Sequence, residues 1–270
     1  MNTIKNEVQI SSVSLMSGKE CNAKILPSVE PGIRFHLGDS FVLAHIDNLV
    51  STQHCVVLGN KDVKKVALVE HFMAACAICN LDSLDVYLSH YELPILDGSA
   101  KGWVDLFKKA GQQVKDNKKY TVSEPVQYLN GKTHLVILPS DKLSITYSVN
   151  YNHPDLTNRW VSLNPKNIDE IASARTFGYL KDLKLYQLAG FGRGVTVENT
   201  VGLKDDGSYT TDLRCELEPA KHKILDLIGD LRLTGFNPLN FKAEIIVKEA
   251  GHTVHTIVAK LLKDKIIEEK

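Results

Sequence analysis

The chain has 270 residues, a length that fits one large domain or two domains of about 100–150 residues each. It carries 32 Lys and Arg residues against 32 Asp and Glu residues, so its formal net charge is zero, and 43% of its residues are hydrophobic. A neutral chain argues against a general nucleic-acid binder, which needs a basic surface to displace counterions from phosphates. The composition predicts an ordered protein with a substantial core.

The apolar runs are all shorter than the roughly 18–20 residues that span a lipid bilayer. The first residues, MNTIKNEVQISS, lack the basic and then apolar order of a signal peptide. The five cysteines are an odd number spread thinly along the chain, which is not the pattern of a disulfide framework. We therefore expect a cytoplasmic protein without a transmembrane segment.

Cys76 and Cys79 form a C-x-x-C pair, which is found in redox and metal sites. Here the pair lies in AACAIC, inside an apolar run, and the chain has no second C-x-x-C to complete a zinc site. We interpret both residues as small buried core thiols, in preference to the redox or metal alternative.

The first sixty residues alternate short polar and apolar runs broken by Gly, Pro and Asp, which predicts strands and hairpins. The run VALVEHFMAACAIC (66–79) keeps apolar residues on a helical period and predicts a mostly buried helix. LDVYLSHY then predicts a strand, and residues 97–111 predict an amphipathic helix that begins at Asp97. The polar cluster at 113–119 indicates a domain boundary.

The second half repeats this plan. Strands are predicted at YTVSEPVQYL, THLVILP, LSITYSVNY and FKAEIIVKEA, and helices at NIDEIASART, AKHKILDLIGDLRL (220–233) and GHTVHTIVAKLLKDKI. In each half a histidine near a helix start leads through an apolar helix and a turn into a strand, and then into an amphipathic helix. This faint duplication predicts an α+β fold of two similar domains, residues 1–118 and 119–270, each a sheet with helices.

His222 and Asp226 lie four residues apart on a predicted helix, so both project from one face. That spacing lets an imidazole nitrogen and a carboxylate oxygen converge on one metal ion. Asp230 lies another turn along, where it could orient a histidine. The alternative is an ordinary helix with a polar face, because H-x-x-x-D alone is a weak motif.

Glu70 and His71 stand between apolar residues, where ionisable groups are costly unless they are paired or metal-bound. As a third protein ligand, His71 would leave the fourth position of a zinc ion open. Glu70 could then act as a general base toward a water molecule. The alternative is that both side chains point to solvent at a helix start, where Glu70 complements the helix dipole.

His252 follows Gly251 at a predicted strand-to-helix turn. It is a candidate general acid, because histidine titrates near neutrality. The alternative is a residue in water at the start of a helix. We interpret His255, three residues on, as a surface residue.

Five blocks in order carry a resemblance to a known family: VEH near residue 70, ILDGSA at 95–100, SARTFG at 173–178, EPAKHKILDLIGDL at 218–231, and Gly251-His252. Over nearly its whole length the chain resembles the UDP-3-O-acyl-N-acetylglucosamine deacetylases, the zinc amidases of lipid A biosynthesis. The resemblance implies that the helices are sandwiched between the sheets of the two domains. It also implies a βαβ insert near 179–201 that forms an apolar tunnel for the acyl chain of the substrate.

The resemblance further implies a set of site residues, with Zn²⁺ as the cofactor and a UDP-linked acylated amino sugar as the substrate. The metal ligands would be His71, His222 and Asp226. The catalytic groups would be Glu70 as general base, His252 as acid, Asp230 as the partner of that acid, and Thr176 beside the oxyanion. The residues in contact with substrate would be Lys223, Phe177 and Leu15. We expect the protein to be a monomer.

Three positions depart from the family pattern. Met16 stands where the family has a histidine on the substrate side, Val195-Thr196 replaces Gly-Ser, and His255 replaces an asparagine. None of these positions belongs to the implied metal ligands or proton-transfer groups. Two alternatives stay open at the level of sequence: a related zinc amidase that acts on another acylated amino sugar, and a catalytically silent binding paralogue.

Overall fold

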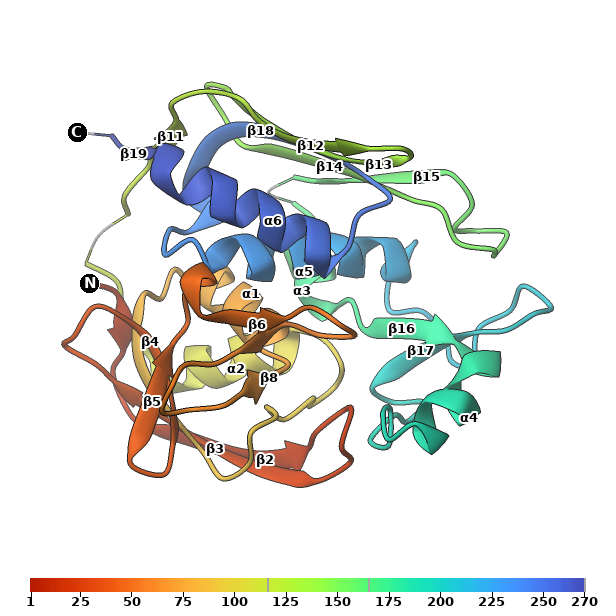
Figure 1. The fold of residues 1–270 in the computed structure, drawn as a ribbon, viewed down its shortest axis with the longest axis horizontal. Coiled ribbons are helices and arrows are strands. Elements are labelled where there is room, and N and C mark those ends of the chain that lie inside the picture. Colours follow the sequence, from red (N-terminus) through yellow and green to blue (C-terminus); the bar gives the residue numbers. More distant parts are fainter. Residues whose placement is uncertain (116, 165, 270) are drawn as a thin grey trace.

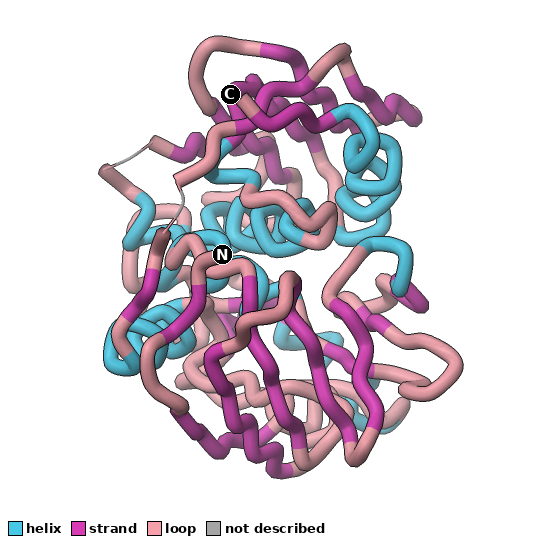
Figure 2. The backbone as a smooth tube through the Cα atoms, turned by 90° about the vertical axis from the view of Figure 1, so that its left-hand side faces the viewer, coloured by secondary structure: helices cyan, strands magenta, loops and turns pink. Residues whose placement is uncertain are grey.

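The computed structural model describes residues 1–115, 117–164 and 166–269. Two main sheets form the outer layers and most of the helices lie between them (Figures 1 and 2), which is the predicted α+β arrangement. The helices are α1 (Glu70–Ile78), α2 (Lys101–Ala110), α3 (Ile168–Ser173), α4 (Leu180–Leu188), α5 (Glu218–Arg232) and α6 (His252–Leu262).

The first sheet has the strand order β2-β3-β9-β4-β5. Its strands are β2 (Val8–Val13), β3 (Glu20–Pro27), β4 (Gly32–Leu37), β5 (Ser40–Leu43) and β9 (Ser83–Leu88). The central strand β9 runs antiparallel to β3 and parallel to β4. Phe35 of this sheet packs edge-to-face on Phe72 of α1, with ring centroids 5.5 Å apart, and Phe72 also meets Trp103 of α2. These aromatic contacts fix α1 against the inner face of the sheet.

The second sheet repeats the same pairing around β18. Its strands are β11 (Tyr120–Val122), β12 (Val126–Asn130), β13 (Thr133–Pro139), β14 (Ser144–Val149), β15 (Arg159–Leu163), β18 (Phe241–Lys248) and β19 (Ile266–Glu268). Strand β18 runs antiparallel to β13 and parallel to β14, as β9 does between its own neighbours. Each central strand follows a helix (α1 or α5) and precedes another (α2 or α6). The division of the chain at residues 118 and 119 stays a prediction.

Helices α1 and α5 pack directly against each other between the sheets. Gly229 makes this approach possible, because a Cβ built on it would lie only 2.1 Å from the carbonyl oxygen of Glu70. Helix α5 carries His222 and Asp226, and α1 carries Glu70 and His71. The close crossing therefore brings the chemistry-bearing residues of the two halves together.

A small unit projects at one side from the body formed by the two sheets and the helices between them (Figure 1). Strand β16 (Thr176–Tyr179) pairs in parallel with β17 (Thr200–Leu203), and α4 lies between them in sequence, which makes a βαβ unit. No residue of α4 is buried, and Leu185 and Leu188 are 70% and 78% exposed. The remaining short strands are β1 (Thr3–Ile4), β6 (Leu49–Ser51), β7 (Val57–Leu58), β8 (Val66–Ala67) and β10 (Gln112–Gln113).

Four predicted helix ends are wrong by three residues or more. The helix predicted over NIDEIASART ends at Ser173, because Thr176 already belongs to strand β16. The helix predicted from residue 66 begins at Glu70, because Leu68 has a left-handed backbone (φ 64°) that separates β8 from α1. The helix predicted from residue 97 begins at Lys101, because the Asp97 carboxylate accepts hydrogen bonds from Ser99 in a turn. The closing helix ends at Leu262, and the chain continues into β19, which pairs with β11.

Cys76 and Cys79 are free and buried, which agrees with their interpretation as core thiols. In the part of the chain that the structure describes, no helix has the length and apolar character needed to cross a bilayer.

Candidate active site

A cavity of about 440 Å³ opens between the βαβ unit and the crossing of α1 and α5. Its apolar lining comes mostly from the βαβ unit, whereas α1, α5 and α6 supply most of its charged and histidine side chains. Most of the site residues that we predicted from the sequence line it: Leu15, Glu70, His71, Thr176, Phe177, His222, Lys223, Asp226 and His252. Asp230 is the exception: it does not line the cavity but is fully buried, and its carboxylate contacts Nδ1 of His252. The structure thus brings all the predicted residues to one place.

Three of these residues converge as a donor set for a metal ion. Asp226 Oδ1 lies 3.2 Å from His222 Nε2 and 3.8 Å from His71 Nε2. One donor atom from each residue lies within 4.8 Å of the other two. Two imidazoles and a carboxylate, with one position open, are a ligand set typical of catalytic zinc.

The burial of these donors fits a cation. Among the described residues, Asp226 Oδ1 has no hydrogen-bond partner although it is buried, and a buried carboxylate oxygen without a partner is costly. Burial lowers the pKa of His71 to about 3, with the neighbouring His222 adding to the effect, so the ring is neutral and keeps a lone pair. A divalent cation between these atoms would satisfy both groups.

Lys223 keeps Asp226 ionised. Its Nζ donates a hydrogen bond of 2.5 Å to Asp226 Oδ2, and both side chains are buried. Burial alone would raise the pKa of Asp226, but Lys223 and His222 outweigh it and hold the pKa well below its usual range. The carboxylate is therefore charged at neutral pH, the state that a metal ligand requires.

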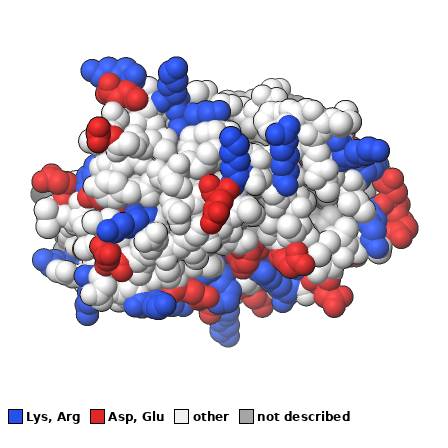
Figure 3. Space-filling model, turned by 90° about the horizontal axis from the view of Figure 1, so that it is seen from below, with Lys and Arg blue, Asp and Glu red and all other residues white. Residues whose placement is uncertain are grey.

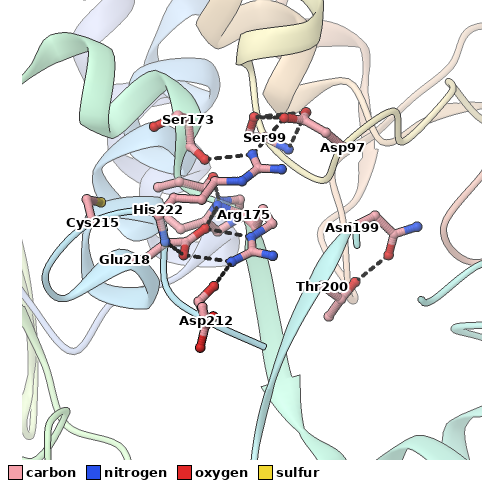
Figure 4. A network of polar contacts seen from close by, with 12 residues as sticks. Asp97, Ser99, Ser173, Arg175, Asn199, Thr200, Asp212, Cys215, Glu218 and His222 are labelled. Atoms are coloured by element: carbon pink, nitrogen blue, oxygen red, sulfur yellow. Dashed lines mark hydrogen bonds and ion pairs between the residues drawn. The ribbon is translucent and has the colours of Figure 1, made fainter. Parts of the chain in front are cut away.

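The ring of His222 is oriented from behind by the SARTFG segment (Figure 4). Its Nδ1 lies 2.9 Å from the carbonyl oxygen of Ala174. Since that oxygen can only accept, Nδ1 carries the proton and Nε2 is left to face Asp226. The backbone N–H and Nε of Arg175 donate to Glu218 Oε1 at 2.9 and 2.8 Å, and this buried ion pair fixes the position of the carbonyl.

The ILDGSA segment (95–100) also holds the SARTFG segment, whose Thr176 begins strand β16. Gly98 O accepts the backbone N–H of Thr176 at 2.8 Å, and Arg214 Nη1 bridges Asp97 and the carbonyl oxygen of Ser173 at 2.7 and 3.0 Å. Gly98 has φ 82°, and a Cβ there would lie 1.7 Å from a backbone oxygen. Glycine is therefore required at this position, and the turn places Thr176 on the wall of the cavity.

Glu70 and His252 face each other beside the donor set. Glu70 Oε2 accepts the backbone N–H of Val56 at 3.1 Å, and its Oε1 lies 3.7 Å from His252 Nε2. Glu70 and His71 are only 2% and 4% exposed, which excludes the alternative that they point to solvent. His252 Nδ1 lies 2.7 Å from Asp230 Oδ2.

The two groups have the protonation behaviour of a base and an acid. Burial raises the pKa of Glu70 to about 7. Burial would lower the pKa of His252, but Asp230 and Asp226 outweigh it and raise the pKa to about 9. Near neutral pH His252 therefore holds its proton, whereas Glu70 readily gives its own proton up. General acid catalysis needs the first state and general base catalysis needs the second.

The interpretation of His255 as a surface residue is wrong. His255 is fully buried, because the face of α6 that packs on α5 includes both His252 and His255, three residues apart. That spacing was the signal that the sequence offered.

Glu92 was also missed in the sequence. Its carboxylate accepts the backbone N–H groups of Met16 and Ser17 at 2.6 and 2.9 Å, and these hydrogen bonds hold the loop that carries Leu15.

Two histidines and an aspartate beside a Glu–His pair, all on the wall of a largely apolar cavity, are the residue types of a metal-dependent hydrolase with an apolar substrate group. The chain matches the LpxC family, described as UDP-3-O-acyl N-acetylglycosamine deacetylase, over residues 1–264, and it belongs to that family.

Curated relatives match the chain over most of its length. It is 31% identical to the UDP-3-O-acyl-N-acetylglucosamine deacetylase of Leptospira biflexa, a match that covers 98% of this chain and 90% of the relative. Identity to the enzyme of the same name from Nautilia profundicola is 33%, over 96% of this chain and 90% of the relative. The corresponding enzyme of Thermodesulfovibrio yellowstonii is 32% identical, with coverage of 94% and 88%.

Proposed function

We propose that the protein hydrolyses the acetamide of UDP-3-O-acyl-N-acetylglucosamine and releases acetate, as a step of lipid A biosynthesis. Membership of the deacetylase family supports this reaction, and the relatives carry the name of the same activity. The observation that carries the proposal is the convergence of His71, His222 and Asp226 with Glu70 and His252 on the wall of the cavity.

The cofactor in this proposal is Zn²⁺, held by His71, His222 and Asp226. Bound there, zinc would acidify a water molecule and polarise the amide carbonyl. The chain prepares the site by keeping Asp226 ionised beside Lys223 and His71 neutral in its buried position.

Glu70 and His252 move the protons. Glu70 takes a proton from the attacking water, whose oxygen forms a bond to the carbonyl carbon. The hydroxyl of Thr176 donates a hydrogen bond to the oxyanion that this addition creates. His252 then gives its Nε2 proton to the amide nitrogen as the C–N bond breaks, because its Nδ1 is turned toward Asp230. Acetate and a free amino sugar are the products.

The apolar lining of the cavity supports a substrate with an acyl chain. Residues of the insert near 179–201 supply much of the apolar lining, including Leu183, Phe191 and Val195. We propose that Phe177 and Leu15 contact the substrate between this region and the donor set. Lys223 lines the cavity beside Asp226, where its charge favours polar groups of the substrate.

We propose that the protein acts as a monomer, because residues of one chain supply every group that the mechanism uses. We also place the reaction in the cytoplasm, as expected from the sequence. Figure 3 shows positive and negative side chains interspersed on the face seen from below. A mixed surface of this kind agrees with a small-molecule substrate rather than a nucleic acid.

An assay of acetate release tests the proposal. The purified protein with zinc should release acetate from UDP-3-O-acyl-N-acetylglucosamine and not from UDP-N-acetylglucosamine, since only the first can fill the apolar cavity. Release from neither compound would refute the proposed substrate. Purified protein that holds less than about 0.2 zinc per chain, and regains none on titration, would refute the metal site.

A further inference from the structure

A second histidine shares the carboxylate that holds His252. His255 is fully buried, and its Nδ1 lies 2.8 Å from Asp230 Oδ2, the oxygen that is also 2.7 Å from His252 Nδ1. An ionised carboxylate only accepts hydrogen bonds, so both rings carry a proton on Nδ1. This arrangement fixes the tautomer of both rings and leaves Nε2 as the exchanging nitrogen of His252.

The other nitrogen of His255 reaches the second sheet. Its Nε2 lies 2.9 Å from the hydroxyl oxygen of Tyr147, a fully buried residue of β14. The same hydroxyl lies 2.8 Å from the carbonyl oxygen of Ala250, just before the turn that carries His252. His255 therefore connects the Asp230 carboxylate on α5 to α6 and to the sheet behind it.

The carboxylate has few other restraints. Asp230 Oδ1 is buried and has no hydrogen-bond partner among the described residues, so two imidazole N–H groups on Oδ2 hold this anion. If one donor were lost, the carboxylate could rotate, and the ring of His252 would follow it. His252 Nε2 would then leave its place 3.7 Å from Glu70 Oε1.

We propose that His255 is a positioning residue: it holds Asp230 so that His252 presents Nε2 to the reacting amide. Neither His255 nor Tyr147 lines the cavity, so both act through Asp230 and not by touching substrate. The kinetic consequence of this inference rests on the proposed function, whereas the geometry of the three groups can be tested without it.

The kinetic test compares two substitutions at the same position. His255→Leu removes the N–H donor and should lower kcat by about tenfold or more, with KM within about twofold and unchanged zinc content. His255→Asn restores an N–H donor and should return kcat to within about threefold of wild type. Val258→Ala, buried on the same helix, is the control for lost packing and should leave kcat unchanged.

Wild-type kcat in His255→Leu, or an equal loss in the Leu and Asn variants, would overturn the proposal. If His255→Leu does not fold, Tyr147→Phe serves instead, because it removes only the hydroxyl that anchors the ring. That variant should lose kcat by roughly threefold at unchanged KM, and an unchanged kcat would count against the anchoring role.

A spectroscopic readout separates this inference from the proposed function. In ¹⁵N-labelled protein the Nδ1–H signal of His252 reports its bond to Asp230. The signal should shift in His255→Leu and return toward its wild-type position in His255→Asn. An unshifted signal in His255→Leu would refute the positioning role, whereas a wild-type protein that releases no acetate would refute only the proposed reaction.

Discussion

Gly229 on α5 faces the carbonyl oxygen of Glu70 on α1 so closely that a Cβ on the glycine would lie 2.1 Å from that oxygen. The atom in the way is backbone, and it belongs to the residue that precedes a proposed metal ligand. The spacing of the two helices, and with it the distance between His71 and Asp226, depends on the absence of one methyl group.

Gly229→Ala should therefore destabilise the protein and spread the donor set. Overpacking costs about 1–3 kcal/mol, and here a rigid backbone has to move. We expect a lower midpoint of thermal unfolding and weaker zinc binding in an equilibrium titration. Gly178→Ala is the control, since a Cβ at that position meets nothing within 4 Å. Equal stability of the two variants would contradict the helix-spacing argument.

Glu70→Gln and His252→Ala should each lower turnover by about two orders of magnitude or more, because each removes one partner of the proton transfer. Both proteins should keep their zinc and their thermal midpoint. The glutamine oxygen can still accept the backbone N–H of Val56, which holds residue 70 in place. A variant that turns over at the wild-type rate would remove its residue from the mechanism.

The pH dependence of kcat/KM should be bell-shaped. Glu70 acts as a base only when deprotonated, so activity rises with pH through its pKa, which burial raises to about 7. His252 acts as an acid only when protonated, so activity falls above its pKa of about 9, which the carboxylates of Asp230 and Asp226 sustain against burial. A bound divalent cation favours ionised Glu70 and moves the acidic limb below 7.

Rate measurements from about pH 5 to 10 check these limbs. Asp230→Asn removes the negative charge that sustains the proton on His252, so the basic limb should move to lower pH. An unmoved basic limb in that variant would assign the limb to another group.

His222→Ala should lose the metal, because it removes one of three proposed ligands. Zinc per chain after dialysis is the measurement, and it should fall well below that of the wild type. His36→Ala is a matched control, since His36 lies on the outer side of the first sheet and bonds Asp85. Full zinc retention in His222→Ala would contradict its role as a ligand.

The residues that the sequence predicted for the site lie together in the structure, whereas several predicted ends of the elements are wrong. His222 and Asp226 could be paired because helical spacing is local, and the family motifs placed His71 and His252 beside them. The start of α1 was wrong because the left-handed backbone of Leu68 leaves no signature in residue type.

Contacts between distant segments were beyond the reach of periodicity. The spacing from His252 could have placed His255 on the buried face of α6, but nothing in the local sequence reveals its partner Tyr147, which is 108 residues away. Strand β19 was missed for the same reason, since it exists only through its pairing with β11.

Arg175→Leu should damage the site without touching the donor set. The substitution leaves Glu218 buried without its cation, which typically costs about 3–5 kcal/mol. It also loosens the segment whose Ala174 carbonyl orients His222, and loss of such support typically weakens metal affinity by about 10–100-fold. Arg214→Leu is the control. It breaks the neighbouring ion pair between Arg214 and Asp97, and because each of these side chains is 31% exposed, the loss of stability should be much smaller. Calorimetry and zinc titration of the two variants compare them directly. If both lose the same stability and zinc affinity, burial of the Arg175–Glu218 pair is not what holds His222 in place.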